Sequence, residues 1–221
     1  MAHSSSMRRV APLLALTVVL ALVAAGCLEL PGEVGDPAGP KVIVIGDSMV
    51  LEAAPQITNQ LVGSGYRVTL FGQDRLDTRQ ALELIDQAVA RGPASVVVIT
   101  TANDATSLQA GRTVEDGART WFDVRDTLDL AFRKLDGVPC TTWMLIDEHA
   151  IWYRLAETGP TVNALVQGVA ALRPQQVRLL DWRNMLVTHP EYDKGDQLHT
   201  NDLGSQRLAQ DIGASVAGCH G

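Results

Sequence analysis

The stretch Lys41–Leu51 (KVIVIGDSMVL) constrains the fold more than any other part of this 221-residue chain. Its first half, Val42–Ile45, is a short apolar and β-branched run, which is typical of a buried parallel strand, and the run stops at Gly46. From Ser48 onward the apolar residues recur at the spacing of a helix. Ser48 therefore lies at a strand-to-helix turn, where a hydroxyl can be exposed above the carboxyl end of a sheet.

A serine at such a turn has two interpretations. It can cap the helix, because serine is among the residues preferred at the N-cap position. Alternatively, it is a nucleophile whose own backbone N–H, unpaired in the first helical turn, faces a developing anion. The residues around Ser48 leave both interpretations open, so the rest of the chain has to decide between them.

Strand and helix patterns alternate along the remainder of the chain. Apolar strand segments follow at 66–71, 96–100, 141–146 and 177–181. Helical spacing is found at 78–90, at about 119–135, at about 161–172 and in a last segment that ends near 216. Repeated β-α-β units imply right-handed connections and a parallel sheet that is covered on both faces. We therefore expect an α/β three-layer sandwich with a parallel, flavodoxin-like five-stranded sheet.

Composition limits the classes of function. Hydrophobic residues make up 46% of the chain, charged residues 19%, and the net charge is −7. A chain of this length and apolar content can bury a full core as one domain. The excess of acidic residues argues against a nucleic-acid partner, because binding to phosphates relies on Lys and Arg.

The N-terminus is typical of a secretory signal. Arg8 and Arg9 precede an uncharged apolar run, Val10–Ala25, which is short for a membrane span and ends in small residues. Cys27 follows directly, so the segment resembles a bacterial lipoprotein signal, in which this cysteine becomes the lipidated first residue. Plain secretion and an uncleaved anchor are the alternatives.

These features predict three parts and an exported location. Residues 1–26 form the signal peptide, residues 27–40 are a tether rich in Pro, Gly and acids, and residues 41–221 form the domain. We expect the protein at the outer face of the cytoplasmic membrane or in the periplasm, lipid-anchored at Cys27, or secreted. With Cys27 lipidated, Cys140 and Cys219 remain, and in an oxidising compartment we expect a disulfide that ties the C-terminal helix to the sheet.

Polar residues collect at one edge of the predicted sheet. Ligand sites in such folds lie at the carboxyl ends of the strands. Ser48, Gly72, Asn103, His149 and the loop 196–199 all follow strands and are expected there. This convergence favours Ser48 as a nucleophile over Ser48 as a simple cap.

A nucleophilic serine needs a base, a group that orients the base, and donors for the oxyanion. His199 is the best base, because Asp196 lies three residues ahead on the same short loop and can accept from the imidazole. Asn103 can direct its side-chain amide to the oxyanion. The backbone N–H groups of Ser48 and Gly72 would complete the oxyanion hole.

The motifs resemble those of SGNH (GDSL-type) serine hydrolases. The first block matches as Gly46-Asp47-Ser48, the third loosely as Thr101–Asp104, and the last as Asp196–His199. The segments 45–54, 180–182 and 196–204 are similar to the extracellular SGNH domain of bacterial membrane acyltransferases that O-acetylate peptidoglycan. The resemblance implies Ser48 as nucleophile, His199 as base, Asp196 as orienting acid, and Asn103 with the Ser48 N–H as oxyanion donors.

Two positions depart from the pattern of that family. Thr101 stands where the third block has glycine, and it would crowd the backbone beside Asn103. The second block has a glycine donor in the family, and the region here, Phe71–Arg75, offers only Gly72 for that role. A damaged oxyanion hole would indicate a slow or non-catalytic relative.

Other residues have a structural alternative beside a functional one. His149 is a metal ligand, a second acid-base residue or, more simply, a polar loop residue. His189 is more simply a loop residue than a base, because it lacks an orienting acid as well placed as Asp196. Trp152 and Tyr153 either stack on sugar rings or cover the core. Two further tryptophans in periodic segments are expected in the core: Trp121 and Trp143.

The residues and the resemblance together predict a serine ester hydrolase without a metal or cofactor. It would act outside the cell on O-acyl groups, with an acetylated glycan or a small ester as substrate. Transfer of the acyl group to a cell-wall sugar hydroxyl is the alternative, and it would need a membrane acyl-donor protein or a soluble donor. A non-catalytic glycan-binding envelope protein is a third interpretation. The Gly-x-Ser-x-Gly elbow of α/β-hydrolases is incomplete here, because Val50 occupies the position of its second glycine, and this disfavours that class of enzyme.

Overall fold

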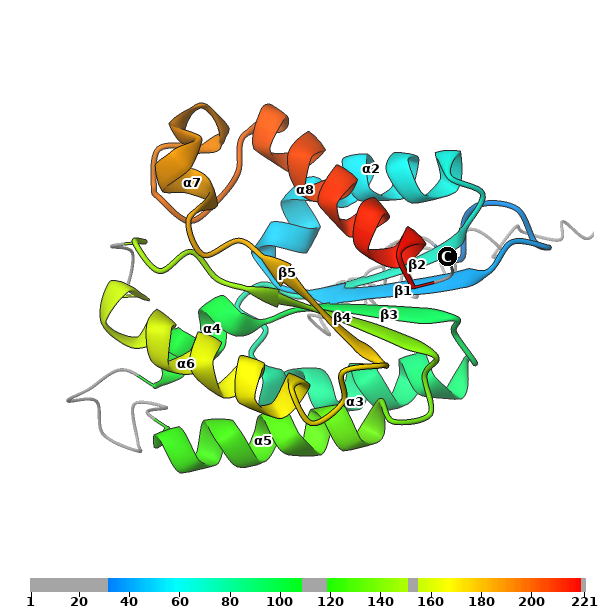
Figure 1. The fold of residues 1–221 in the computed structure, drawn as a ribbon. Coiled ribbons are helices and arrows are strands. Elements are labelled where there is room, and N and C mark those ends of the chain that lie inside the picture. The colour runs from blue at the N-terminus through cyan, green and yellow to red at the C-terminus, as the bar shows by residue number, and fades with distance from the viewer. Residues whose placement is uncertain (1–31, 109–118, 151–154, 220–221) are drawn as a thin grey trace, which may run out of the picture.

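The fold is built around one parallel sheet. The computed structural model describes residues 32–108, 119–150 and 155–219 (Figure 1). The strands pair in the order β2-β1-β3-β4-β5, and every pair is parallel. Their bounds are Lys41–Gly46 (β1), Arg67–Gly72 (β2), Ser95–Ile99 (β3), Cys140–Leu145 (β4) and Val177–Asp181 (β5). The expected flavodoxin-like, five-stranded sheet is confirmed.

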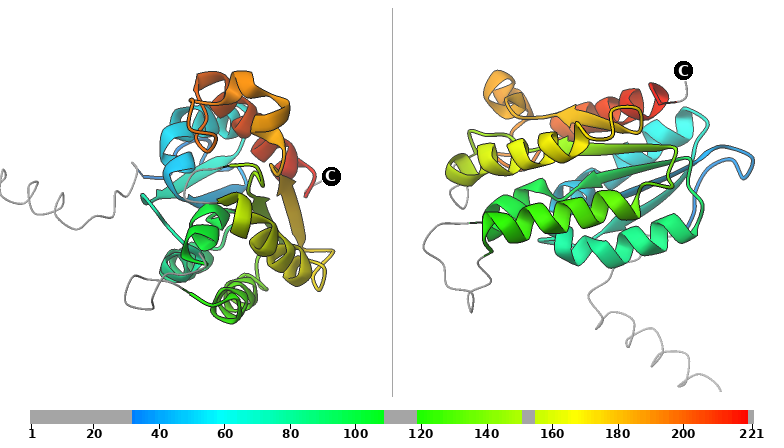
Figure 2. Two further views of the ribbon diagram at one scale, coloured as in Figure 1. Left: turned by 90° about the vertical axis from the view of Figure 1, so that its left-hand side faces the viewer. Right: turned by 60° about the horizontal axis from the view of Figure 1, so that its bottom comes forward.

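Helices cover both faces of the sheet. One layer contains α2 (Ser48–Gly63), α7 (Met185–Thr188), the 3₁₀ helix η3 (Pro190–Tyr192) and α8 (Asp202–Ala217). The other layer contains α3 (Thr78–Ala90), α4 (Thr101–Ser107), α5 (Trp121–Lys134) and α6 (Leu155–Ala170). The two layers are separated by the sheet in both views of Figure 2, as a three-layer sandwich requires.

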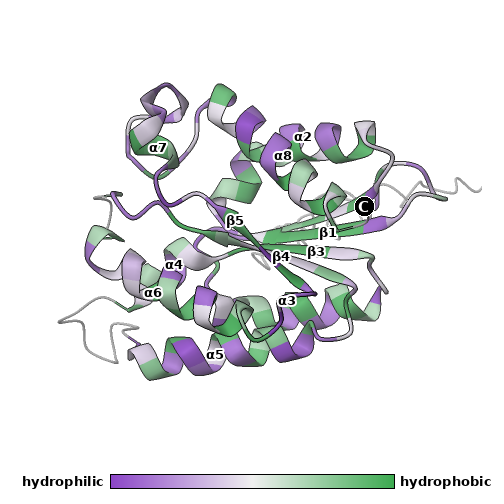
Figure 3. Cartoon of the chain, viewed as in Figure 1, coloured by the Kyte–Doolittle hydropathy of each residue, from purple (hydrophilic) through white to green (hydrophobic). Residues whose placement is uncertain are grey.

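The central strands are apolar on both sides, which explains their continuous hydrophobic runs. In β1, Ile43 and Ile45 belong to the core shared with α3, α5 and α6, whereas Val42 and Val44 belong to the core shared with α2 and α8. All four side chains are fully buried. Figure 3 shows the hydrophobic strands at the centre and polar residues on the outward faces of the helices. A sheet covered on both faces selects such runs over the alternation of a half-exposed strand.

One segment that the sequence pattern indicates as a polar break is a helix. Thr101–Ser107 forms α4, directly after β3. Seven residues are too few to display an apolar period. Polar residues are also tolerated in a first helical turn, where Asp104 interacts favourably with the helix dipole. The helix matters for function because it carries Asn103.

Two further expectations need correction. α6 runs from Leu155 to Ala170 and includes Pro160, whereas the sequence pattern suggested a helix at about 161–172. The first turns of α6 are held by packing, since Leu155 is fully buried and the Thr158 hydroxyl donates to the Ala105 carbonyl at 2.8 Å. Trp121 was expected in the core but is 44% exposed, because it starts α5 and stacks on the neighbouring Phe122 instead.

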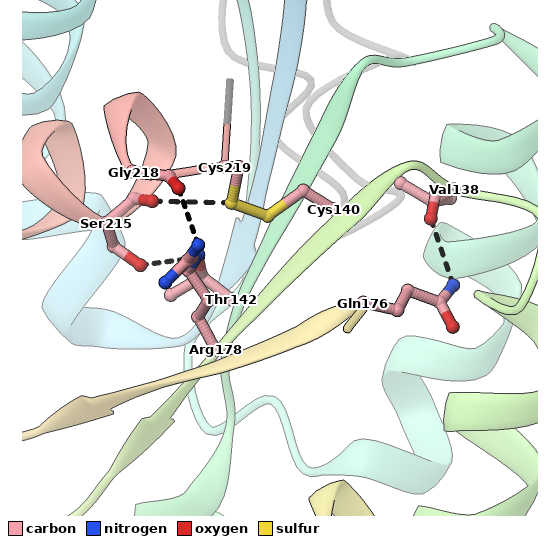
Figure 4. The surroundings of a disulfide bond; sticks show 8 residues. All are labelled: Val138, Cys140, Thr142, Gln176, Arg178, Ser215, Gly218 and Cys219. Atoms are coloured by element: carbon pink, nitrogen blue, oxygen red, sulfur yellow. Dashed lines mark hydrogen bonds between the residues drawn. A yellow bond between two sulfur atoms is a disulfide. The ribbon is translucent and has the colours of Figure 1, made fainter. Parts of the chain in front are cut away.

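A disulfide joins Cys140 at the start of β4 to Cys219 just beyond α8, with 5.9 Å between their Cα atoms (Figure 4). Nearby, the hydroxyls of Thr142 and Ser215 lie 2.8 Å apart. The sequence-based expectation of a link between the last helix and the sheet agrees with this arrangement. These contacts lie at the amino edge of β4, remote from the carboxyl ends of the strands.

The end of the predicted tether lies against the free edge of the sheet. Val34 and Val68 exchange backbone hydrogen bonds of 2.9 and 2.7 Å as an isolated antiparallel bridge on β2. Glu33 adds ion pairs to Lys41 and Arg67. Residues 32–40 therefore cover part of an edge that would otherwise expose unpaired backbone groups. Among the described residues, no helix has the length and apolar content needed to cross a membrane.

Candidate active site

Asp47, not Ser48, caps the helix that follows β1. The Asp47 carboxylate accepts from the backbone N–H of Met49 at 3.0 Å, and Asp47 is the N-cap residue of α2. Ser48 is the first residue of the helix, so its backbone N–H has no intrahelical acceptor. The capping interpretation of Ser48 is therefore wrong, and its hydroxyl is available for another partner.

Close packing fixes the height of Ser48 above the sheet. A Cβ atom at Gly46 would lie 2.3 Å from Cγ2 of Val50 and 3.0 Å from the carbonyl oxygen of Ile99. Only glycine lets α2 leave β1 this close to β3. The residue before Asp47 is thus selected by backbone approach, and the turn that follows is held against two strands.

Ser48, His199 and Asp196 form one hydrogen-bonded chain. Oγ of Ser48 lies 2.9 Å from Nε2 of His199, and Nδ1 of the same ring lies 2.6 Å from Oδ2 of Asp196. The side chains of His199 and Asp196 are 17% and 28% exposed, so the chain is sheltered but open to a small molecule. Residues separated by about 150 positions in the sequence meet here, as the sequence analysis expected.

The environment of Asp196 favours its ionised form. Burial pushes its pKa up, but the backbone N–H groups of His199 and Leu198 and the His199 ring outweigh burial, and the pKa is lowered. The backbone bonds measure 2.8 and 3.0 Å. An ionised Asp196 can hold the imidazole in the tautomer that presents an unprotonated Nε2 to Ser48 and can stabilise the imidazolium that forms.

The loop that carries His199 is itself fixed from both ends. Oδ1 of Asp193 accepts from the N–H groups of Gly195 and Gln197, at 2.9 and 3.0 Å. Gln197 has a φ of 60°, in the left-handed region that non-glycine residues rarely adopt. At the far end, Asn201 caps α8 by accepting from the N–H of Gly204. The segment that carries His199 and Asp196 is therefore anchored by Asp193 before it and by Asn201 after it.

Asn103 approaches the site from α4 and is held by Asp47. Its Nδ2 donates to Oδ2 of Asp47 at 2.7 Å. An amide nitrogen has two N–H groups, so one remains for another acceptor. Burial raises the pKa of Asp47 to about 7, opposed by its bonds to Met49 and Asn103 and by His199. Asp47 has no assigned role in the sequence analysis, although a polar residue before a helical run is the usual signal for an N-cap.

Thr101 is directed away from the site. Its hydroxyl donates to the carbonyl of Met144 at 2.5 Å and accepts from Nε1 of Trp143 at 3.2 Å. Both partners belong to β4, and Thr101 is 1% exposed. The side chain that replaces the family's glycine therefore packs into the core. The expectation that Thr101 crowds the backbone beside Asn103 is wrong.

Gly72 is the last residue of β2 and stays a predicted oxyanion donor. Backbone N–H groups of a strand alternate between its two sides. Gln73 donates toward β1, to Gly46 at 3.0 Å, whereas Val68 donates to Val34 on the free side. Gly72 is an even number of residues from Val68, so its N–H is directed to the same free edge of the sheet. This direction argues against Gly72 as an oxyanion donor. The turn that follows contains Arg75 at a φ of 56°.

The two other histidines singled out in the sequence do not join this group. Nδ1 of His189 lies 3.1 Å from Glu191, and its ring stacks on Tyr192. His149 lies 3.4 Å from Asp147 and is half exposed. In the described part of the chain, no group of three or more His, Cys, Asp or Glu side chains is placed to share a metal ion. Three of the residues considered lie outside the described ranges: Cys27, Trp152 and Tyr153.

No protein-family model and no curated protein matches the sequence. Solved structures do resemble the fold. LAE5, an α/β hydrolase enzyme from the metagenome of Lake Arreo, is 18% identical with a TM-score of 0.68, over 82% of this chain and 96% of its own. The acetylxylan esterase Axe2 from Geobacillus stearothermophilus is 16% identical with a TM-score of 0.66, over 84% of this chain and 96% of its own.

A third structure comes from the acyltransferases. The C-terminal catalytic domain of peptidoglycan O-acetyltransferase A from Streptococcus pneumoniae is 19% identical with a TM-score of 0.56, over 82% of this chain and 95% of that domain. Each alignment spans nearly the whole of the compared chain, so the likeness concerns the complete fold. At these sequence identities the likeness establishes the fold, and the chemistry has to be argued from the residues of the site. The chain has the three-layer α/β fold that these two hydrolases and the O-acetyltransferase domain share, which is the fold class expected from the sequence.

Proposed function

We propose that the protein is a serine ester hydrolase that removes O-acyl groups, with acetyl as the simplest case, from carbohydrate. The observation that carries the proposal is the hydrogen-bonded chain from Ser48 through His199 to Asp196, with spacings of 2.9 and 2.6 Å. Nucleophile, base and orienting acid are the three parts that acyl transfer through serine requires. The esterases and the O-acetyltransferase that share the fold support the substrate class.

The reaction follows from the roles of these groups. His199 takes the proton of Ser48 as Oγ attacks the ester carbonyl, and the tetrahedral intermediate places a negative charge on the former carbonyl oxygen. The C–O bond of the ester then breaks, and the imidazolium gives its proton to the departing sugar hydroxyl. Water, deprotonated by the same imidazole, then attacks the acyl-serine. The bond between the acyl carbon and Oγ breaks, the imidazolium returns its proton to Oγ of Ser48, and the acid is released.

The oxyanion would be stabilised by the Ser48 N–H and the free N–H of the Asn103 amide. Asp47 holds that amide in place at 2.7 Å. A second backbone donor would come from Gly72 or from the turn that follows it, where Arg75 holds a left-handed conformation. Strained turns of this kind occur disproportionately at functional sites.

Transfer of the acyl group to a sugar hydroxyl is the second candidate. It uses the same acyl-serine and differs only in the acceptor, and the likeness to the peptidoglycan O-acetyltransferase domain favours it. It would require an acyl donor, either a membrane protein or a soluble ester. We also propose, from the N-terminal signal, that the domain works outside the cytoplasm, anchored through a lipid on Cys27.

Hydrolysis of p-nitrophenyl acetate tests the serine mechanism. The unmodified chain should release p-nitrophenol, and both Ser48→Ala and His199→Ala should reduce kcat/KM by at least about 10³-fold. Labelling of Ser48 by an activated organophosphonate should be lost in the same variants. A chain that neither turns over the ester nor reacts with the phosphonate would contradict the hydrolase proposal and favour a glycan-binding module or a transferase that depends on a partner. Adding a glycan acceptor then separates hydrolysis from transfer.

A further inference from the structure

A cavity of ≈ 360 Å³ lies between the end of β4, α7 and the loop that carries His199. Its polar lining includes His149, Asp193 and Gln197, and its apolar lining includes Leu186, Val187 and Pro190. Figure 1 places α7 and the end of β4 at the same edge of the sheet as the start of α2. We propose that this cavity is a subsite for one neutral sugar ring of the acylated carbohydrate, an inference that rests on the proposed function.

The cavity shares a wall with the catalytic loop. Asp193 and Gln197 are joined by the hydrogen bond that shapes this loop, and Asp196 and His199 belong to the same short segment. Gln197 is exposed and is held at a φ of 60° by the loop. A molecule seated in the cavity would therefore lie against the loop that carries His199.

Polar atoms on the wall are available for a ligand. Within the described residues, the side-chain amide of Gln197, Oδ2 of Asp193 and Nε2 of His149 have no hydrogen-bond partner. Two of these side chains use their other polar atom within the protein: Oδ1 of Asp193 accepts from the loop N–H groups, and Nδ1 of His149 lies 3.4 Å from Asp147. A donor and acceptor amide, a carboxylate and an imidazole can together bind several hydroxyls.

The rest of the lining is mostly apolar, and it is held in place by a buried acid. The Asp147 carboxylate accepts from the N–H of His149 at 2.8 Å and from the N–H of Leu186 at 2.9 Å, which ties the loop after β4 to α7. Val187 on α7 is 58% exposed. A lining that combines apolar side chains with polar groups suits a sugar ring, which has a face of C–H groups and a rim of hydroxyls.

The size and charge of the cavity limit the class of ligand that it can bind. The volume is at the lower end of the range of about 300–1,000 Å³ that is typical of small-molecule sites, which suits one ring and not a longer oligomer. Two carboxylates, Asp147 and Asp193, line the cavity, and cationic side chains are absent from its lining in the described residues. An anionic sugar would be repelled, so the subsite selects a neutral ring.

Calorimetric titration of the full chain with two neutral trisaccharides, xylotriose and the β-1,4 trimer of N-acetylglucosamine, tests the subsite. At least one trisaccharide should bind, and the one that binds more tightly indicates which type of glycan supplies the sugar ring. Val187→Trp, which fills the cavity, should weaken binding at least about tenfold. Leu172→Trp, on a residue that is 75% exposed beyond the end of α6, is the matched control and should bind like the unmodified chain.

Gln197→Asn provides an independent variant, because asparagine tolerates the left-handed backbone while its amide is shorter by one methylene. It should also weaken binding. The subsite is overturned if neither trisaccharide binds, or if Val187→Trp binds as the control does. Turnover of p-nitrophenyl acetate by the unmodified chain is measured separately: without it, and with cavity-dependent binding, the hydrolase proposal fails and the subsite stands.

Discussion

Asp47 and Ser48 divide two tasks that one residue cannot perform together. Asp47 accepts from the N–H of Met49 and from the Asn103 amide, so it caps α2 and positions a predicted oxyanion donor at the same time. Ser48 keeps its hydroxyl for His199. Both residue types suit an N-cap, so local preference leaves the choice open. The backbone of the turn decides it, because Asp47 and not Ser48 has the extended conformation of a cap.

The first prediction concerns Asn103. Asn103→Ala removes a donor to the oxyanion, so kcat for p-nitrophenyl acetate should fall by about 10²–10³-fold with little change in KM. Thr106→Ala is the control on the same helix, because the Thr106 hydroxyl donates only to the preceding turn, at the carbonyl of Ala102. Equal kcat values for the two variants would exclude Asn103 from the oxyanion hole.

A second prediction concerns the buried carboxyl of Asp104. It accepts from the Thr78 N–H at 3.1 Å and lies 3.4 Å from the Arg119 guanidinium. Burial raises its pKa from 3.8 to about 7. The folded protein therefore holds this proton more tightly than the unfolded chain. The resulting stability is fully present below pH 3.8 and is lost as the pH rises through about 7.

Asp104→Asn cannot ionise, so its free energy of unfolding should depend less on pH between about 4 and 7, by up to ~1.4 kcal/mol per pH unit. Urea unfolding at several pH values in that range measures the slope. Asp74→Asn, at an exposed carboxylate, should keep the slope of the unmodified chain. A slope unchanged in Asp104→Asn would show that this carboxyl ionises normally. Asp47 contributes a slope of the same sign.

At the scale of elements, the site depends on close docking of helices. A Cβ atom at Gly204 would lie 2.5 Å from the Tyr192 carbonyl oxygen and 2.8 Å from Cβ of Thr200. The start of α8 therefore lies directly against η3, and the Asp193–Asn201 segment between them is the one that carries His199 and Asp196. Small residues at such contacts set where the base lies relative to α2.

The third prediction compares two glycines in helices. Gly204→Ala should reduce stability and esterase activity together, because the backbone carbonyl of Tyr192 cannot yield. Gly168→Ala is the matched control in α6, where nothing lies within 4 Å of the added Cβ. Helix propensity predicts that it stabilises the protein by about 0.5–1 kcal/mol, with activity retained. Thermal unfolding and p-nitrophenyl acetate turnover measure both. The two variants should change the free energy of unfolding in opposite directions. Equal changes would contradict the close docking of α8 against η3.

At the scale of the whole molecule, support and chemistry lie at opposite edges of the sheet. The disulfide joins Cys140, at the amino end of β4, to the end of α8, across a sequence separation of 79 residues. The residues that we propose as catalytic collect at the carboxyl ends of the strands. Changes at the disulfide should therefore alter stability more than the geometry of Ser48 and His199.

The fourth prediction follows from this separation. The double variant Cys140→Ser/Cys219→Ser should lose about 2–4 kcal/mol of stability, because the cross-link limits the unfolded chain. Turnover of p-nitrophenyl acetate below the unfolding temperature should stay near that of the unmodified chain. Reductant should lower the melting temperature of the unmodified chain and leave the variant unaffected. A large loss of activity in the folded variant would show that the link also shapes the site.

Much of the fold could be predicted because it depends on local patterns. Buried parallel strands require continuous β-branched runs, and these runs mark β1 and β3 directly. The chirality of β-α-β units then leads to one sheet with a single carboxyl edge. Ser48, Asn103 and His199 follow or approach that edge in the chain order, so their convergence could be inferred without coordinates.

Other features were decided only by contacts between distant segments. α4 is too short to display a period, and Trp121 lies at a helix start that the apolar spacing does not orient. The direction of Thr101 depends on partners in β4, and the cavity beside the His199 loop is formed by the loop after β4 together with residues 186–197, which are distant from it in sequence. Periodicity determined the layers and the edge at which the chemistry lies. Tertiary packing determined which polar atoms form hydrogen bonds within the protein and which can bind a ligand, because the partners of these atoms come from segments that are distant in sequence.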